Sequence, residues 1–186
     1  EAAPVAEIIR DPVEVAERER ETGTAAAAAA LPRPELIYGD GRRNSLGLPL
    51  SEPGVRRQLL AEMSAALAGS FAVGPLVNGR PTTGGDKAAV IACPHDRRER
   101  IGTVRSAEPE TIEAAVASAT AAAHAWDRRG GPARAAILEK AADLYERDRA
   151  RLMAIIVREA GKTLENAQGD IREAVDFLRY YAGEAR

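Results

Sequence analysis

The sequence predicts a mainly α-helical unit with a short β-hairpin or meander, and it predicts that this unit is an incomplete domain. Apolar residues at helical spacing fill the C-terminal half of the chain, and short β-like runs with turn signals precede them. This pattern leaves one sheet face and at least one helix face without a cover. Aromatic residues are only 4% of the chain, so the 45% apolar content is mostly small and aliphatic, which favours closely packed helices.

Composition and charge exclude several classes of protein. The 26 basic and 28 acidic residues give a formal net charge of -2, which provides no electrostatic reason for a nucleic-acid or anionic-membrane partner. The single cysteine, Cys93, rules out an internal disulfide and fits a reducing compartment. No apolar run approaches the roughly 20 residues that cross a bilayer, and the N-terminus carries acids where a signal peptide is basic. We therefore expect a cytoplasmic protein.

The first third of the chain predicts little regular structure apart from helices at its two ends. Residues 13–23 form a charged stretch that is compatible with a helix, and residues 24–34 are a low-complexity linker that ends in two prolines. Residues 35–54 are rich in Gly, Pro, Asn and Ser and are expected to be irregular and extended. A helix over about 54–68 is predicted by helically spaced apolar residues, namely Val55, Leu59, Leu60, Met63 and Leu67.

Short strands are predicted between residues 75 and 106. The run "PLVNGRP" is a strand that enters an Asn78-Gly79 turn, which is a strong hairpin signal. Residues 87–94 and 101–106 form a second and a third strand, with a polar loop between them. We expect a small β-hairpin or meander here.

Three helices are predicted after the strands. The first begins at Pro109, because proline is favoured in the first helical turn. The second begins at Pro132 and continues to Gly161, a typical C-terminal stop, and the third begins near Leu164.

Each helix has a predicted apolar face. These faces consist of Ile112, Val116, Ala119, Ala123 and Trp126 in the first helix; Ile137, Ala141, Leu144, Leu152, Ile155, Ile156 and Glu159 in the second; and Ile171, Ala174, Val175, Leu178 and Tyr181 in the third. On the outer side of the third helix, Arg172 and Asp176 are spaced to form an ion pair.

One cluster of chemically reactive residue types is present, at Cys93-Pro94-His95-Asp96. As a metal site it offers at most three ligands on one short loop, and no second cluster completes a tetrahedron. As a nucleophile pair it fails because Pro94 directs the chain onward, away from the thiol. We interpret the cysteine as a small residue that ends a strand before a turn.

Other candidate motifs also favour structural roles. Gly161-Lys162-Thr163 imitates the end of a phosphate-binding loop, but Ile156 replaces the required glycine and a helix precedes the motif. His124 lies beside the predicted apolar face of its helix and is expected to be partly exposed. Basic pairs alternate with acids on loops, at Arg42-Arg43, Arg97-Arg98 and Arg128-Arg129. We therefore assign no catalytic, cofactor-binding or metal-ligating residue.

The order of motifs over residues 75–186 resembles the N-terminal part of the aldehyde dehydrogenase superfamily. The matching pieces are the "VNG" turn, a strand ending in "CP", the "IGTV" strand, a helix ending in Trp126, then "RAAILEKAADL" and "EAGKT". A narrower resemblance joins "LPRPELIYGDGRRNSLGLPLS" at 31–51 with "REAGKTLENAQGDIREAVDFLRYYA" at 158–182. Together these segments are similar to the proline utilization A family of bifunctional proline-catabolic enzymes.

The resemblance implies an α/β parent enzyme of the aldehyde dehydrogenase type, of which this chain is a fragment. Residues 1–30 would be the tail of a proline dehydrogenase module and a linker, residues 31–74 an inter-module connection with one helix, and residues 75–186 the first part of the aldehyde dehydrogenase module. The final run "REAVDFLRYYAGEAR" has no capping signal, which agrees with the expectation of a larger polypeptide.

In the parent, the resemblance implies that an FAD-dependent module oxidises proline to pyrroline-5-carboxylate, which hydrolyses to glutamate semialdehyde. An NAD-dependent module then oxidises the aldehyde to glutamate through a nucleophilic cysteine, an oxyanion-binding Asn and a general-base Glu. All three residues belong to later parts of the family's sequence, and Cys93 aligns with an Asn-Pro turn instead.

The expected partners of the chain are therefore the remainder of its own polypeptide, a small-molecule substrate of the parent and further copies in a homo-oligomer, with no nucleic acid evident. The isolated chain is expected to bind no cofactor and to be inactive. Two alternatives stay open: a non-catalytic scaffold or interaction module derived from an aldehyde dehydrogenase N-terminus, and a stand-alone aldehyde dehydrogenase as the parent.

Overall fold

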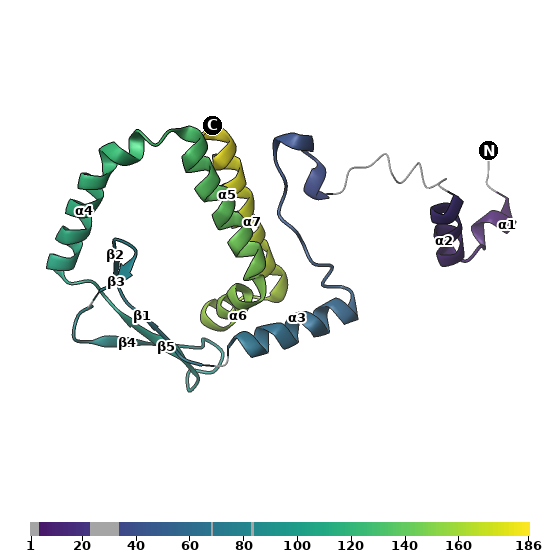
Figure 1. Cartoon of the computed structure of the whole chain (residues 1–186). Coiled ribbons are helices and arrows are strands. Elements are labelled where there is room, and N and C mark those ends of the chain that lie inside the picture. The colour runs from purple at the N-terminus through teal and green to yellow at the C-terminus, as the bar shows by residue number, and fades with distance from the viewer. Residues whose placement is uncertain (1–3, 23–33, 68, 83) are drawn as a thin grey trace.

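The computed structural model describes residues 4–22, 34–67, 69–82 and 84–186 (Figure 1). Its helices are α1 Val5–Ile8, α2 Pro12–Thr22, α3 Pro53–Ala66, α4 Pro109–Asp127, α5 Gly131–Arg147, α6 Arg149–Ala160 and α7 Leu164–Glu184, with 3-10 turns η2 Pro34–Leu36 and η3 Gly39–Gly41. Its strands are β1 Phe71–Val73, β2 Leu76–Val77, β3 Arg80–Pro81, β4 Ala88–Ala92 and β5 Arg100–Arg105. The prediction of a mainly helical unit with a few short strands is confirmed.

The described N-terminal elements agree with those predicted from the sequence. Helix α2 matches the charged stretch at 13–23, while the linker predicted at 24–34 lies almost wholly outside the described residues. Residues 42–49 are extended after two 3-10 turns, as expected for a Gly- and Pro-rich segment. Helix α3 begins with a proline in its first turn and buries Leu59 and Met63.

Three strands were predicted, and they correspond to β2, β4 and β5, but the structure places them in two sheets rather than in one hairpin or meander. Strands β2 and β3 make a two-stranded antiparallel hairpin around Asn78 and Gly79, whose φ angles are 54° and 69°. Positive φ at both central residues is the geometry of a tight hairpin turn. Strands β4 and β5 pair antiparallel in a second sheet, with an irregularity between Ile91 and Ala92.

Strand β1 was not predicted, and it falls inside the segment that we expected to be a connection with one helix. It pairs parallel to β5, with Phe71 opposite Gly102, so the second sheet has the order β1-β5-β4. The two backbones approach so closely that a Cβ atom at Gly102 would clash with the Phe71 carbonyl. A glycine inside a strand is therefore the sequence feature that marks this pairing.

The predicted burial of the apolar face of α4 is wrong in this structure. Helix α4 starts at Pro109 as expected, but Ile112, Val116 and Trp126 are 53%, 60% and 46% exposed. The main contact of α4 is with the two-residue strand β2, supported by a hydrogen bond between Ser118 and the hairpin residue Asn78. Such a small element cannot cover a 19-residue helix.

The second predicted helix is two helices, α5 and α6, which are separated at Asp148. The backbone of Asp148 has φ -94° and ψ 14°, and its carboxylate pairs with Arg147 at 2.7 Å. Neither Gly nor Pro marks this break, although Asp favours helix ends over interiors. The predicted face shifts accordingly: Ile137 is 42% exposed, while Ala135 and Ala142 are fully buried.

The junction between α6 and α7 confirms the structural interpretation of "GKT". Gly161 ends α6 with φ 68°, the left-handed conformation that favours glycine at helix C-termini. Thr163 begins the next helix, because its hydroxyl accepts a hydrogen bond from the main-chain N of Asn166 at 3.2 Å.

Helix α7 buries most of its predicted apolar face. Ile171 and Val175 are buried, but Tyr181 is 56% exposed, so its predicted burial is wrong. The buried position in that turn belongs to Ala182, one residue further along the helix. Helices α5 and α7 lie side by side, and α6 joins them near α3 (Figure 1). The core between α3, α5, α6 and α7 consists of Leu50, Leu59, Met63, Ala142, Met153, Ala154, Ala167, Ile171 and Val175.

Candidate functional site

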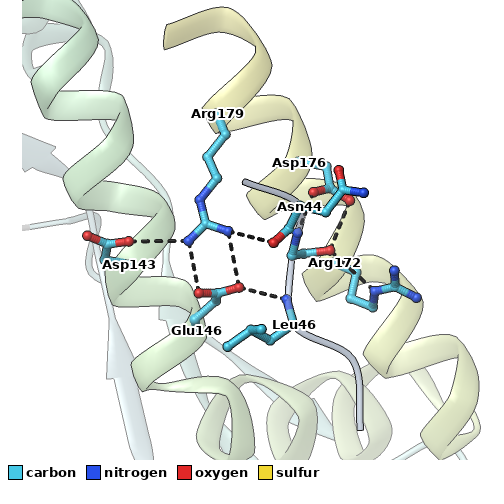
Figure 2. A network of polar contacts seen from close by, with 8 residues as sticks. Asn44, Leu46, Asp143, Glu146, Arg172, Asp176 and Arg179 are labelled. Carbon is cyan, nitrogen blue, oxygen red and sulfur yellow. Dashed lines mark hydrogen bonds and ion pairs between the residues drawn. The ribbon is translucent and has the colours of Figure 1, made fainter. Parts of the chain in front are cut away.

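A polar seam joins the extended residues 44–48 to helices α5 and α7 (Figure 2). Its centre is Arg179 of α7, which is only 9% exposed and lies between α5 and the extended segment. The guanidinium donates to the main-chain carbonyl of Asn44 at 3.1 Å and meets Glu146 of α5 at 2.9 Å. Glu146 in turn accepts the main-chain N–H of Leu46 at 2.8 Å. One ion pair therefore binds both the carbonyl and the amide sides of the segment.

The surroundings of Arg179 favour its charged form. A second acid, Asp143, lies 3.3 Å from the guanidinium. Burial lowers the pKa of Arg179, whereas hydrogen bonds and charge interactions with Glu146 and Asp143 raise it, and the net direction is upward. The guanidinium therefore remains a cation and a donor at all pH values at which the protein folds.

The rest of the seam is made by three polar side chains on successive turns of α7. Asp176 accepts both the main-chain N–H and the hydroxyl of Ser45, at 2.7 and 2.9 Å. Arg172 donates to the same hydroxyl at 3.2 Å. Gln168 both accepts from and donates to the main chain of Leu48, at 2.8 and 3.2 Å. The predicted Arg172–Asp176 pair is thus corrected: both side chains bind Ser45, which lies between them and is 2% exposed.

A cavity of about 570 Å³ lies beside the seam. Its lining is charged and comes from the extended segment, α5 and the end of α7, namely Gly41, Arg42, Arg43, Glu139, Asp143, Arg179 and Arg186. Two of these arginines are already paired, because Arg179 meets Asp143 and Arg186 meets Glu139. The two carboxylates of the lining, Glu139 and Asp143, each hold one of these arginines, so the contacts at the cavity wall position the helices.

The Cys93 cluster does not converge into a reactive site. Cys93 follows β4, is 0% exposed, and donates its main-chain N–H to Glu99 at 3.0 Å, which closes the turn to β5. Asp96 points to Arg98 at 2.8 Å, and this hydrogen bond lowers the pKa of its carboxyl. In the described ranges, no group of three or more His, Cys, Asp or Glu side chains is arranged to hold a metal ion. The interpretation of Cys93 as a strand-ending residue is confirmed.

The environment of the Cys93 thiol is nevertheless specific. Burial raises its pKa, whereas main-chain groups of Asp96 and His95 and the nearby Arg158 lower it, and the net direction is downward. Arg158 also pairs with Glu99, which ties the turn to the end of α6. Full burial keeps reagents away from this thiol, so the lowered pKa does not make Cys93 reactive in the folded chain.

The remaining candidates lie apart from the seam. His124 is exposed on α4, and Arg97-Arg98 and Arg128-Arg129 lie on exposed turns. Arg42 is different, because its guanidinium lies 4.2 Å from the ring of Tyr38 and 5.7 Å from the ring of Tyr180. The third basic pair, Arg42-Arg43, therefore belongs to the part of the chain that packs on α7.

The sequence alone did not predict that Ser45, Glu146 and Arg179 belong to one polar network. A signal for Arg179 was present, because it lies four residues after Val175 on the buried side of α7. A long cation at a buried helical position requires a partner, so it indicates an ion pair. Ser45 gave no such signal, since its partner Asp176 is 131 residues away in the sequence.

Comparisons with known proteins match the chain to longer oxidoreductases. Residues 82–186 match the aldehyde dehydrogenase family. The bifunctional protein PutA of Escherichia coli (strain K12) is 39% identical over 189 residues, which cover 98% of this chain and 14% of that protein. The chain thus spans about a seventh of the length of this relative. Along the described part of the chain, every helix is too short or too polar to cross a membrane.

Solved structures agree with this match. The crystal structure of proline utilization A from Bdellovibrio bacteriovorus, inactivated by N-propargylglycine, superposes with a TM-score of 0.75 at 30% identity, over 84% of this chain and 16% of that one. The 1-pyrroline-5-carboxylate dehydrogenase from Thermus with bound NAD superposes with a TM-score of 0.68 at 29% identity, over 75% of this chain and 27% of that one.

Proposed function

The chain belongs to the aldehyde dehydrogenase family, and we propose that it is part of a bifunctional enzyme that converts proline to glutamate. The observation that carries the proposal is the extent of the PutA match. The family match begins only at residue 82, whereas the similarity to PutA covers 98% of the chain, including the segment that forms the seam. The 1-pyrroline-5-carboxylate dehydrogenase from Thermus superposes on 75% of the chain and leaves the remainder unmatched, whereas the PutA match includes it.

We further propose a division of the chain along this enzyme. Residues 1–30 are the tail of a proline dehydrogenase module and a linker, and residues 31–74 are the inter-module connection. Residues 75–186 are the first part of the aldehyde dehydrogenase module. Support comes from the seam, where the connection docks on helices of the dehydrogenase part. Strand β1 qualifies this division, because residues 71–73 already pair with β5.

In the proposed enzyme, FAD accepts electrons from proline and NAD accepts hydride from glutamate semialdehyde. One sequence motif of the chain imitates part of a nucleotide site. The sequence that imitates a phosphate loop joins two helices at Gly161 and Thr163, whereas a nucleotide loop follows a strand. We therefore propose that the 186-residue chain alone binds neither cofactor and is inactive, and that its parent is cytoplasmic.

The mass of the native protein tests whether the chain is part of a larger enzyme. An antibody against residues 158–182, followed by intact mass spectrometry from source cells, should detect a protein several times larger than the 19.7 kDa of this chain. A native mass near 19.7 kDa would overturn the proposal and would support a non-catalytic scaffold.

Activity assays then test the chemistry. The larger protein should reduce NAD with glutamate semialdehyde, reduce a dye with proline and show flavin absorbance. The purified 186-residue chain should do none of these. Turnover by the short chain would contradict its proposed inactivity, and a larger protein without flavin would identify a stand-alone aldehyde dehydrogenase.

A further inference from the structure

The seam binds the main chain of residues 44–48 far more than their side chains. The carbonyl of Asn44, the amides of Ser45 and Leu46, and both main-chain groups of Leu48 each have a side-chain partner on α5 or α7. The α7 partners at positions 168, 176 and 179 lie on neighbouring turns of one helix face. Apart from the carbonyl of Leu48, which also accepts the main-chain N–H of Leu50 at 2.9 Å, these groups are bound by helix side chains in the way that a neighbouring strand would bind them in a sheet.

We propose that this arrangement is a latch, in which α5 and α7 recognise an extended main chain and fix the position of residues 34–43, which directly precede it. The latch is defined by Glu146, Gln168, Asp176 and Arg179 on the helices and by residues 44–48 on the segment. Its role as the fixed point of an inter-module connection rests on the proposed function. The cooperative behaviour of the latch does not depend on the proposed function, because it is inferred from the contacts alone.

The side chains of the segment support recognition through the main chain. Leu46 is 37% exposed, and a Cβ atom added at Gly47 would meet only the flexible side chain of Arg172, at 3.7 Å. Ser45 is the exception, because its hydroxyl is buried between Arg172 and Asp176. The latch therefore tolerates changes at positions 46 and 47 and requires a small hydroxyl at position 45.

The contacts continue on the N-terminal side of the latch. Arg42 lies between Tyr38, which precedes it in the segment, and Tyr180 on α7, and its guanidinium is 4.2 Å and 5.7 Å from the two ring centroids. Asn44 also donates its side-chain amide to the carbonyl of Pro34 at 2.9 Å. Residues 34–43 are therefore bound to the same anchor, and movement of residue 44 would carry them with it.

Amide hydrogen exchange on the whole native protein that contains these residues tests the latch without any assay of activity. Asp176→Ala removes both acceptors of Ser45 and should speed exchange at Ser45, Leu46 and Leu48 together, by about ten-fold or more. Exchange at the core residue Val175 should stay unchanged, which separates opening of the latch from global unfolding. Asp176→Asn keeps an acceptor and adds a donor, so it should restore most of the protection.

Gly47→Ala is the matched control, since it changes the same segment and its added Cβ atom meets Arg172 only at ordinary van der Waals distance, 3.7 Å. It should leave exchange at all three amides within about two-fold of the unchanged chain. Faster exchange at Ser45 alone in Asp176→Ala would overturn the proposal, because it would show independent contacts rather than a cooperative latch. Unprotected amides in the unchanged chain, or equal effects of Gly47→Ala and Asp176→Ala, would also overturn it.

Discussion

The guanidinium of Arg179 on α7 meets the carboxylate of Glu146 on α5 at 2.9 Å, and the two side chains are only 8% and 14% exposed. A buried pair of this kind offsets its desolvation cost only if the remaining donors and acceptors are also bound. Here they are, because Arg179 also binds Asn44 and Asp143, and Glu146 also binds the amide of Leu46. The pair is thus both a helix–helix contact and the anchor of the extended segment (Figure 2).

Replacement of this arginine should be costly. Arg179→Leu leaves Glu146 buried without its cation and the carbonyl of Asn44 without a donor, so we expect a loss of about 3–5 kcal/mol in the free energy of unfolding. Urea denaturation followed by circular dichroism measures it. Arg98→Leu is the matched control, because Arg98 is 91% exposed in its pair with Asp96 and its loss should change the free energy of unfolding little. Equal losses for the two variants would contradict the central role of Arg179.

Two glycines should respond oppositely to the same substitution. Gly161→Ala puts a side chain at φ 68° and within 3.0 Å of Pro94, so we expect destabilisation by about 1–2 kcal/mol. Gly169 lies inside α7 with nothing within 4 Å of an added Cβ atom, and Gly169→Ala should stabilise by about 0.5–1 kcal/mol. Thermal or urea unfolding of both variants compares them directly. A loss of stability in Gly169→Ala would contradict the open space that the structure shows around Gly169.

The break between α5 and α6 should have a titration signature. The side-chain hydrogen bond from Arg147 lowers the pKa of the Asp148 carboxyl, so the folded value lies below the ordinary value of about 3.9. A depressed pKa means that the stabilising contribution is complete above the unfolded pKa and is lost as the pH falls through the folded one. Carboxyl ¹³C NMR should show this low pKa, and Arg147→Gln should move it upward. An unchanged pKa in that variant would exclude the pair as its cause.

The exposed apolar face of α4 should make the isolated chain self-associate. Ile112, Val116 and Trp126 form a contiguous stripe that water contacts directly. Sedimentation velocity should detect species larger than the 19.7 kDa monomer, and Val116→Lys should shift the distribution toward that monomer. Ala114→Lys adds the same charge on the opposite side of the helix and should change little. A monodisperse monomer in the unchanged chain would refute this prediction.

The sequence predicted the elements that are determined by local signals. Pro109, the Asn78-Gly79 turn, Gly161 and the helical spacing of Ile171 and Val175 each act within a few residues, and the structure has the corresponding helix starts, hairpin, helix end and buried face. Strand β1 escaped prediction because three residues carry no period, and its partner β5 is distant in the sequence.

Burial was harder to predict than secondary structure, because periodicity shows which face of a helix is apolar but not whether another element covers it. Helix α4 has the expected stripe and no adequate neighbour among the described elements. The seam was hidden for a related reason. Ser45, Glu146 and Asp176 are ordinary surface residue types, and only the three-dimensional path of residues 44–48 places them in one network.

The separation of 131 positions between Ser45 and Asp176 also affects how the protein is made. During synthesis at about 5–20 residues per second, residues 44–48 emerge from the ribosome on the order of ten seconds before the helix that binds them. Throughout that interval their amides have only water as a partner, and closing so long a loop adds to the entropic cost of docking. The nascent chain thus carries this segment with its main chain unpaired until α7 has formed.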